Sequence, residues 1–195
     1  GLTAPTIWYL ARLELQSGGV IGGTIPGVPL VLVGRSEKLG WGLTTAYVDD
    51  QDVVIEELNP ENPEEYRTPA GWARFESRQS IIKVKGAEPL TLTLRWSKNG
   101  PILPGGHYDL GSITPAGHVA AISWTALTGR DTSISGGMAL MQAASNSEAL
   151  AAGRKVIAPA QNVMLADEAG IALQVMGAIP ARDPEHPSQG RLPAL

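Results

Sequence analysis

Apolar and polar residues alternate over short stretches in the first third of the chain. These stretches are rich in β-branched and aromatic residues, and glycine or proline separates each from the next. A period of two is typical of strands that bury one face of a sheet. The pattern predicts five strands, at residues 7–15, 19–25, 30–33, 39–47 and 53–58.

The segment NPENPEEYRTPAG, residues 59–71, interrupts this alternation with three prolines. Because proline has no backbone N–H to donate to a sheet, the segment predicts a loop or a short helical turn outside the sheet. Strands are expected to resume after it, at residues 72–75, 80–85, 90–96 and 118–125.

Helical spacing of apolar residues is confined to residues 136–157. Asn146-Ser147-Glu148 is a candidate cap for a second helix after a break in this stretch. The strand pattern returns at residues 161–166 and 171–176, around an Asp-Glu-Ala-Gly turn whose glycine can adopt a positive φ. The proline-rich tail, residues 183–195, predicts a surface loop or a connection to further sequence.

Composition excludes several classes of function. The 195 residues are 43% hydrophobic, enough for one large domain or two small ones, and the longest apolar run, Val28–Val33, is far too short to cross a bilayer. A net charge of −4 with scattered basic residues gives no binding surface for nucleic acid or an anionic membrane. The absence of cysteine excludes disulfides, thiol catalysis and zinc-thiolate sites.

Common catalytic motifs are also absent from the sequence. It contains no G-x-S-x-G, Walker A, G-x-G-x-x-G or H-E-x-x-H pattern. His107, His118 and His186 stand too far apart to form a local metal cluster and are expected at the surface. The five tryptophans have no basic residues interleaved with them, which favours packing over nucleic-acid stacking.

Four ordered segments do carry a family resemblance. They are PGVPLVLVGRSEKLGWGLTTAYVDDQDVVIEEL at residues 26–58, NGPIL at 99–103, QNVMLAD at 161–167 and GAIPAR at 177–182. In this order they resemble the penicillin acylase family of N-terminal nucleophile hydrolases. The chain departs from the family pattern at Arg35-Ser36, where the family has His-Asn, at Asn99, where it has His, and in the turn after Asp167.

The resemblance implies an α+β fold of the αββα type, mostly antiparallel sheet with a short helical segment. Residues 1–195 would form a single internal fragment of the large subunit. The catalytic serine would precede Gly1, so the fragment itself is expected to be inactive. Its partners would be the small subunit and the remainder of the large subunit of the same precursor, and the enzyme would be periplasmic.

The resemblance also assigns site residues. The backbone N–H of Thr45 and the side-chain amide of Asn162 would stabilise the oxyanion of amide hydrolysis, and Arg182 would lie near the amine of the nucleophile. The alternatives are a strand-edge amide for Asn162 and a loop salt bridge for Arg182. Val33 and Leu43 would line the acyl pocket and favour aliphatic chains, such as those of N-acyl-homoserine lactones, over phenylacetyl groups, unless an aromatic residue from elsewhere fills the space.

The acidic run at residues 49–52 is a candidate calcium site. Oxygen ligands at this spacing suit calcium better than zinc. By resemblance, Asp49 and Asp52 would give carboxylate oxygens and Gln51 its carbonyl; the alternative is a solvated acidic turn. No organic cofactor is expected, and the competing function is a non-catalytic β-rich binding module on the same scaffold.

Overall fold

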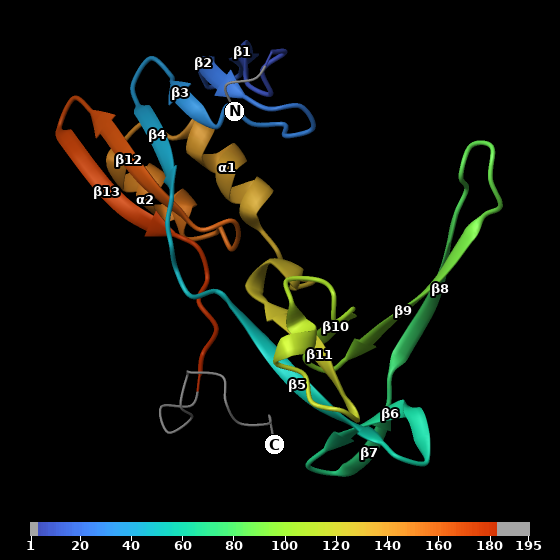
Figure 1. The fold of residues 1–195 in the computed structure, drawn as a ribbon. Coiled ribbons are helices and arrows are strands. Elements are labelled where there is room, and N and C mark those ends of the chain that lie inside the picture. Colours follow the sequence, from blue (N-terminus) through green and yellow to red (C-terminus); the bar gives the residue numbers. More distant parts are fainter. Residues whose placement is uncertain (1–3, 183–195) are drawn as a thin grey trace. The chain divides into compact units, whose positions relative to one another are not determined.

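Two antiparallel sheets contain all the strands of the computed structural model, which describes residues 4–182 (Figure 1). They belong to two compact units. The first comprises residues 4–50 and 128–179, and the second comprises residues 51–127 and 180–182. The predicted α+β class, dominated by antiparallel strands, is confirmed. The predicted tail loop and His186 lie outside the described residues.

The first unit has a six-stranded sheet with strand order β1-β2-β3-β4-β12-β13. Its strands are β1 (Tyr9–Leu15), β2 (Gly18–Thr24), β3 (Val33–Arg35), β4 (Gly40–Thr45), β12 (Gln161–Asp167) and β13 (Gly170–Met176). The helices α1 (Ser133–Gln142) and α2 (Asn146–Gly153) cover one face. Alternate residues of β4 and β12, such as Trp41, Val163 and Leu165, pack against these helices in one apolar core.

The opposite face of β13 is apolar as well. Ile171, Leu173 and Val175 are 79%, 63% and 55% exposed, whereas Ala172 and Met176, which alternate with them, pack into the core. β13 is also an edge strand of this sheet. The sheet of the first unit is therefore covered by helices on one side and leaves this apolar strip uncovered on the other among the described residues.

Both helices begin earlier than the sequence predicts. α1 starts at Ser133, not at Gly136. The glycine pair at which the predicted helix began therefore lies inside the helix, after its first three residues. The cap of α2 is Ser145, whose Oγ accepts a hydrogen bond from the Glu148 N–H at 3.3 Å. Neither helix, nor any other in residues 4–182, has the length and apolarity to cross a membrane.

Asn146, predicted as a cap, instead joins α2 to the β12–β13 turn. Its backbone N–H and its Nδ2 donate to Asp167 at 2.7 and 3.0 Å. The N–H groups of Ala169 and Gly170 also donate to Asp167, at 2.9 and 3.1 Å, and Gly170 has the predicted positive φ. The bonds from backbone N–H groups, that of Asn146 first, lower the pKa of Asp167 below its ordinary value of 3.8.

Replacing Asp167 by asparagine should therefore reduce stability in a pH-dependent way. A lowered pKa in the folded state contributes stability above pH 3.8, and this contribution is lost as the pH falls through the lowered pKa. We expect the full-length Asp167→Asn variant to melt below the wild type at pH 7, with the gap in Tm closing toward pH 3. Glu168→Gln in the same turn is the control. A gap that does not depend on pH would contradict this role.

The second unit has a seven-stranded sheet with strand order β7-β6-β5-β11-β10-β9-β8. Its strands are β5 (Gln51–Asn59), β6 (Asn62–Thr68), β7 (Gly71–Arg74), β8 (Glu76–Ile82), β9 (Leu90–Ser97), β10 (Gly100–Leu103) and β11 (His118–Trp124), with short 3₁₀ turns at Leu110–Ser112 and Thr125–Leu127. The sequence did not predict β10. Asn99, the residue before β10, makes a buried contact. Its Nδ2 donates at 2.9 Å to Glu56, which is 2% exposed.

The prediction of a loop at residues 59–71 was wrong, because this segment contains β6. Pro60 and Pro69 fall in the turns on either side of the strand, where no ladder N–H is needed. Pro63 lies in β6, where the pairing with β5 is irregular and the pairing with β7 has not begun. Sheet geometry thus tolerates all three prolines.

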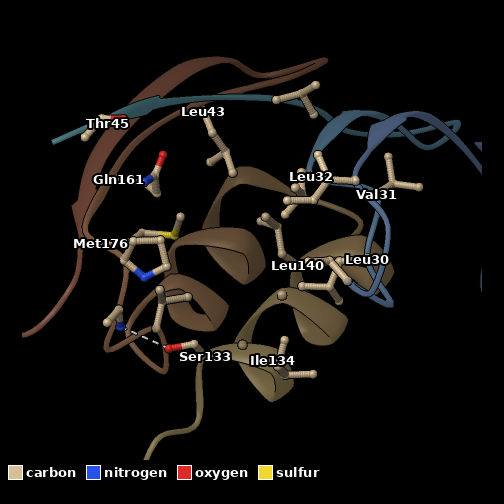
Figure 2. Close-up of a pocket in the computed structure, with 18 of the residues that line it drawn as sticks. Leu30, Val31, Leu32, Leu43, Thr45, Ser133, Ile134, Leu140, Gln161 and Met176 are labelled. Atoms are coloured by element: carbon tan, nitrogen blue, oxygen red, sulfur yellow. Dashed lines mark hydrogen bonds between the residues drawn. The ribbon is translucent and has the colours of Figure 1, made fainter. Parts of the chain in front are cut away.

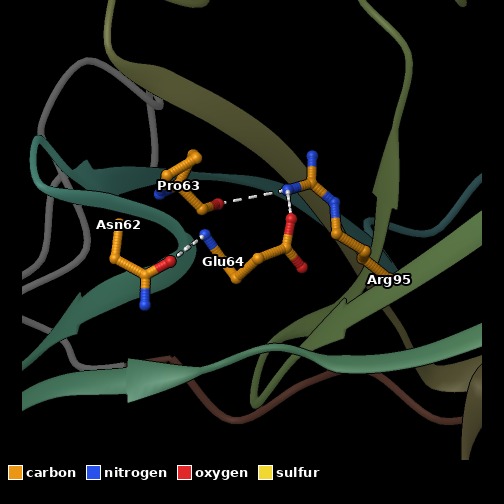
Figure 3. Close-up of polar contacts among 4 residues, drawn as sticks. All are labelled: Asn62, Pro63, Glu64 and Arg95. Carbon is orange, nitrogen blue, oxygen red and sulfur yellow. Dashed lines mark hydrogen bonds and ion pairs between the residues drawn. The ribbon is translucent and has the colours of Figure 1, made fainter.

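Pro63 also connects β6 to β9 (Figure 3). Its carbonyl accepts a hydrogen bond from Arg95 Nη1 at 3.3 Å, and the same nitrogen lies 3.8 Å from the Glu64 carboxylate. The Glu64 N–H donates to Asn62 Oδ1 at 3.2 Å, which shapes the start of the strand. Arg95 therefore joins two strands that are not neighbours in the sheet.

Candidate active site

A cavity of about 500 Å³ lies in the first unit between α1 and the sheet (Figure 2). Aliphatic side chains make most of its wall: Ile25, Val28, Leu30, Val31, Leu32, Val33, Leu43, Ile134, Leu140 and Val156. Trp8, which is 42% exposed, is the one aromatic side chain among the described lining residues. A cavity of this volume and polarity is typical of a site for a small apolar ligand.

Residues 30–32 form part of the wall and are held both by β2 and by side chains. The Leu32 N–H donates to the Gly23 carbonyl of β2 at 3.0 Å. The Val31 N–H donates to Met141 Sδ at 3.1 Å, and the Trp41 Nε1–H donates to the Val31 carbonyl at 3.1 Å. The predicted strand at 30–33 is thus wrong for its first three residues, because their backbone departs from the ladder, and β3 begins only at Val33.

Val33 and Leu43, predicted to share a pocket, both line this cavity. Val33 begins β3, and Leu43 lies in β4 opposite Val163 of the core. The structure therefore brings the two positions to one cavity.

Thr45 lies at one end of the cavity, where β4 pairs with β12 near Asn162. Thr45 lines the cavity, and Asn162 is paired in register with Thr44, which also borders it. Asn162 Nδ2 donates to Thr44 Oγ1 at 3.2 Å and to the Thr45 carbonyl at 3.3 Å. These two bonds fix the orientation of the amide, which lies on the face of β12 opposite to that of Val163 and Leu165.

The backbone N–H of Thr45 points to the other edge of β4. The Ala46 N–H donates to the Ala160 carbonyl at 3.1 Å on the β12 side, and successive N–H groups of a strand point to opposite edges. On that other edge the β3–β4 ladder ends at Trp41, four residues before Thr45. Among the described residues, no strand is therefore paired with the Thr45 N–H side of β4, which leaves this edge open to a ligand.

Arg182 and Asp52 form an ion pair in the second unit. Arg182 Nε donates to Asp52 at 3.0 and 3.3 Å, and both side chains are partly exposed. The contact has the form of the salt bridge that the sequence allowed as an alternative for Arg182. The role near the nucleophile stays a prediction.

The acidic run straddles the boundary between the units, with Asp49 in the first and Gln51 and Asp52 in the second. Among residues 4–182, no group of three or more histidine, aspartate or glutamate side chains converges as metal ligands. Asp52 already accepts from Arg182. The calcium site stays a prediction.

Sequence reasoning missed the contribution of α1 to the cavity. Ile134, Gly136, Gly137 and Leu140 of this helix line it, as does Met176 of β13. The signal available in the sequence was the glycine pair Gly136-Gly137 inside an otherwise helical stretch, since paired glycines there indicate close approach of another group.

The sequence model of the family described as penicillin amidase matches residues 1–195, the whole chain. The chain belongs to the penicillin amidase family. Its curated relatives include two proteins named acyl-homoserine lactone acylase QuiP. The one from Pseudomonas aeruginosa is 27% identical over 186 residues, 93% of this chain, and the one from Pseudomonas syringae pv. syringae is 29% identical over 189 residues, 96% of this chain.

The chain spans 22% of the length of those two relatives. A solved structure, the thermostable penicillin G acylase from Alcaligenes faecalis, superposes with a TM-score of 0.82 at 24% identity, over 98% of this chain and 34% of its own. That likeness confirms the fold expected from the sequence.

Proposed function

We propose that the full-length protein hydrolyses the amide bond of N-acylated substrates and binds the acyl chain in the cavity of the first unit. One observation carries the proposal. Thr44 and Thr45, whose oxygen atoms accept hydrogen bonds from Asn162, border the end of an aliphatic cavity. An apolar chain in the cavity would present its amide carbonyl at these polar groups.

In this proposal the Thr45 N–H and Asn162 Nδ2 donate to the carbonyl oxygen as it becomes negative. Asn162 Nδ2 carries two hydrogens, so one can remain on the Thr45 carbonyl while the other leaves Thr44 Oγ1 for the oxyanion. An N-terminal serine from outside these 195 residues would attack the carbonyl carbon, and its own amine would accept the hydroxyl proton. The substrate amine would leave, and water would then release the acid. The 195-residue chain alone would be inactive.

The lining of the cavity supports an aliphatic acyl group as the substrate class. Val33 and Leu43 give it flexible, non-aromatic walls, and the aromatic Trp8 is partly exposed. The relatives named acyl-homoserine lactone acylase point in the same direction. N-acyl-homoserine lactones are therefore proposed as substrates in preference to phenylacetyl amides such as penicillin G.

The test is a comparison of kcat/KM for the full-length protein across N-acyl-homoserine lactones, from butanoyl to dodecanoyl, with that for penicillin G. Each methylene buried in the cavity should raise kcat/KM by about fourfold, the equivalent of about 0.8 kcal/mol, until the cavity is full. Val33→Phe should shift the optimum to shorter chains because it fills part of the cavity. A clear preference of the wild type for penicillin G would contradict the substrate class, and an unchanged optimum would remove Val33 from the pocket.

Calcium, the small subunit and remaining large subunit as partners, a role for Arg182 near the nucleophile, and a periplasmic location are further parts of this proposal. They are supported by the resemblance to the family alone. The competing function, a non-catalytic binding module, predicts no turnover of any acyl amide by the full-length protein.

A further inference from the structure

Two adjacent glycines occupy the middle of α1, and both line the cavity. Glycine is the least favourable residue after proline in a helix interior. Both have ordinary negative φ values, so backbone conformation does not require glycine at either position. The explanation therefore lies in what a side chain would meet there.

The two glycines face different neighbours. A Cβ at position 136 would lie 3.0 Å from Val156 Cγ2 and 3.1 Å from the Ala152 carbonyl, so Gly136 allows α1 to approach the end of α2. A Cβ at position 137 would lie 2.4 Å from Leu30 Cδ1, with Leu30 Cδ2 and Cγ at 3.3 and 3.4 Å. The three atoms nearest to such a Cβ at position 137 thus belong to one flexible side chain in the cavity wall.

The backbone next to Leu30 cannot move easily to relieve such a contact. The Val31 N–H and carbonyl are bonded to Met141 Sδ and Trp41 Nε1, and both of these side chains are buried. Leu30 itself is 8% exposed and packs in the core. The open space beside it is the cavity, so a group added at position 137 would displace the Leu30 side chain into the cavity (Figure 2).

We infer that Gly137 and Leu30 together determine the length of acyl chain that the cavity accepts. Because Gly137 has no side chain, Leu30 can pack against α1, and the full depth of the cavity is then available to an acyl chain. The pair is a specificity determinant and takes no part in the chemistry. The inference rests on the proposed binding of the acyl chain in this cavity.

The experiment measures binding of straight-chain carboxylic acids, from butanoate to dodecanoate, to the full-length protein by calorimetry. Wild type should show an affinity optimum at one chain length. Gly137→Ala should move the optimum shorter by one or two carbons and weaken binding of the longest acids by about fourfold per excluded methylene. Leu30→Ala should move it longer. The double variant Gly137→Ala/Leu30→Ala should lose the shortening caused by Gly137→Ala and return toward the wild-type optimum, because Leu30→Ala removes the atoms that collide.

Ser135→Ala is the matched control, since it also places alanine in α1 but at an exposed position outside this cavity, and it should keep the wild-type optimum. The inference is overturned if no acid binds to the wild type, if folded Gly137→Ala keeps the wild-type optimum, or if the double variant does not revert. Should Gly137→Ala fail to fold, Leu30→Ala decides, and an unchanged optimum there also overturns it. Acid binding with these shifts but no hydrolysis of any acyl amide would remove the proposed function and leave the inference standing.

Discussion

Asn162→Ala in the full-length protein is expected to lower kcat for N-acyl amide hydrolysis by about 10²-fold or more. The loss of one oxyanion donor typically has this effect, because the donor acts on charge that develops only in the transition state. The amide of Asn162 is oriented by Thr44 Oγ1 and the Thr45 carbonyl and lies at the surface of the sheet, so its removal should have little effect on Tm or KM.

Met164→Ala tests whether the effect is specific. Met164 lies two residues further along β12, on the same face, and is 48% exposed. This variant should keep kcat close to wild type. If Asn162→Ala also keeps the wild-type kcat, Asn162 is only a strand-edge amide and the proposed oxyanion site is wrong.

Gly22→Ala should cause the largest loss of stability among single methyl additions in the first sheet. A Cβ at position 22 would lie 2.1 Å from the Val33 carbonyl oxygen and 2.6 Å from Gly34 Cα, the residue opposite it in β3. These are backbone atoms, so no side-chain rotation can relieve the contact. Overpacking typically costs about 1–3 kcal/mol and occasionally more, and a backbone clash belongs at the upper end of that range.

Gly40→Ala is the matched control for this prediction. Gly40 also lies in a paired strand, and a Cβ there would have only the Ala166 carbonyl oxygen nearby, at 3.9 Å. Alanine at this position should leave stability unchanged or raise it by about 0.4–1 kcal/mol, because it restricts the unfolded chain. Thermal unfolding of the full-length variants makes the comparison. Equal Tm values for the two variants would show that β2 and β3 can separate without cost.

Local pattern was sufficient for the strands that bury one face. Alternation located β1, β2, β4, β12 and β13 to within a few residues, since side chains on successive positions of a strand point to opposite faces. It failed for β6, where three prolines suggested a loop, because the effect of a proline depends on whether its position has a pairing partner. That information lies in the register, which a single strand does not specify.

The candidate site was also predicted in part: its strand residues were predicted from the sequence, and its helical wall was not. Val33, Leu43, Thr45 and Asn162 are carried by motifs that lie in adjacent strands. The structure places the first three in the wall of one cavity and pairs Asn162 with Thr44 of the same wall. The opposite wall could not be predicted, because α1 is about 90 residues further along the chain and its position over the sheet depends on tertiary packing. Gly137 has meaning only when Leu30 is known to lie against it.

The uncovered strip of β13 has a consequence for handling the protein. Ile171, Leu173 and Val175 project from a seven-residue edge strand, whose free backbone groups can pair with a strand from another molecule. Apolar edge strands of this kind are templates for intermolecular association. Expressed as an isolated piece, residues 1–195 should therefore tend to aggregate through β13, and a lysine in place of Leu173 would be the first change to improve recovery of such a piece for structural work.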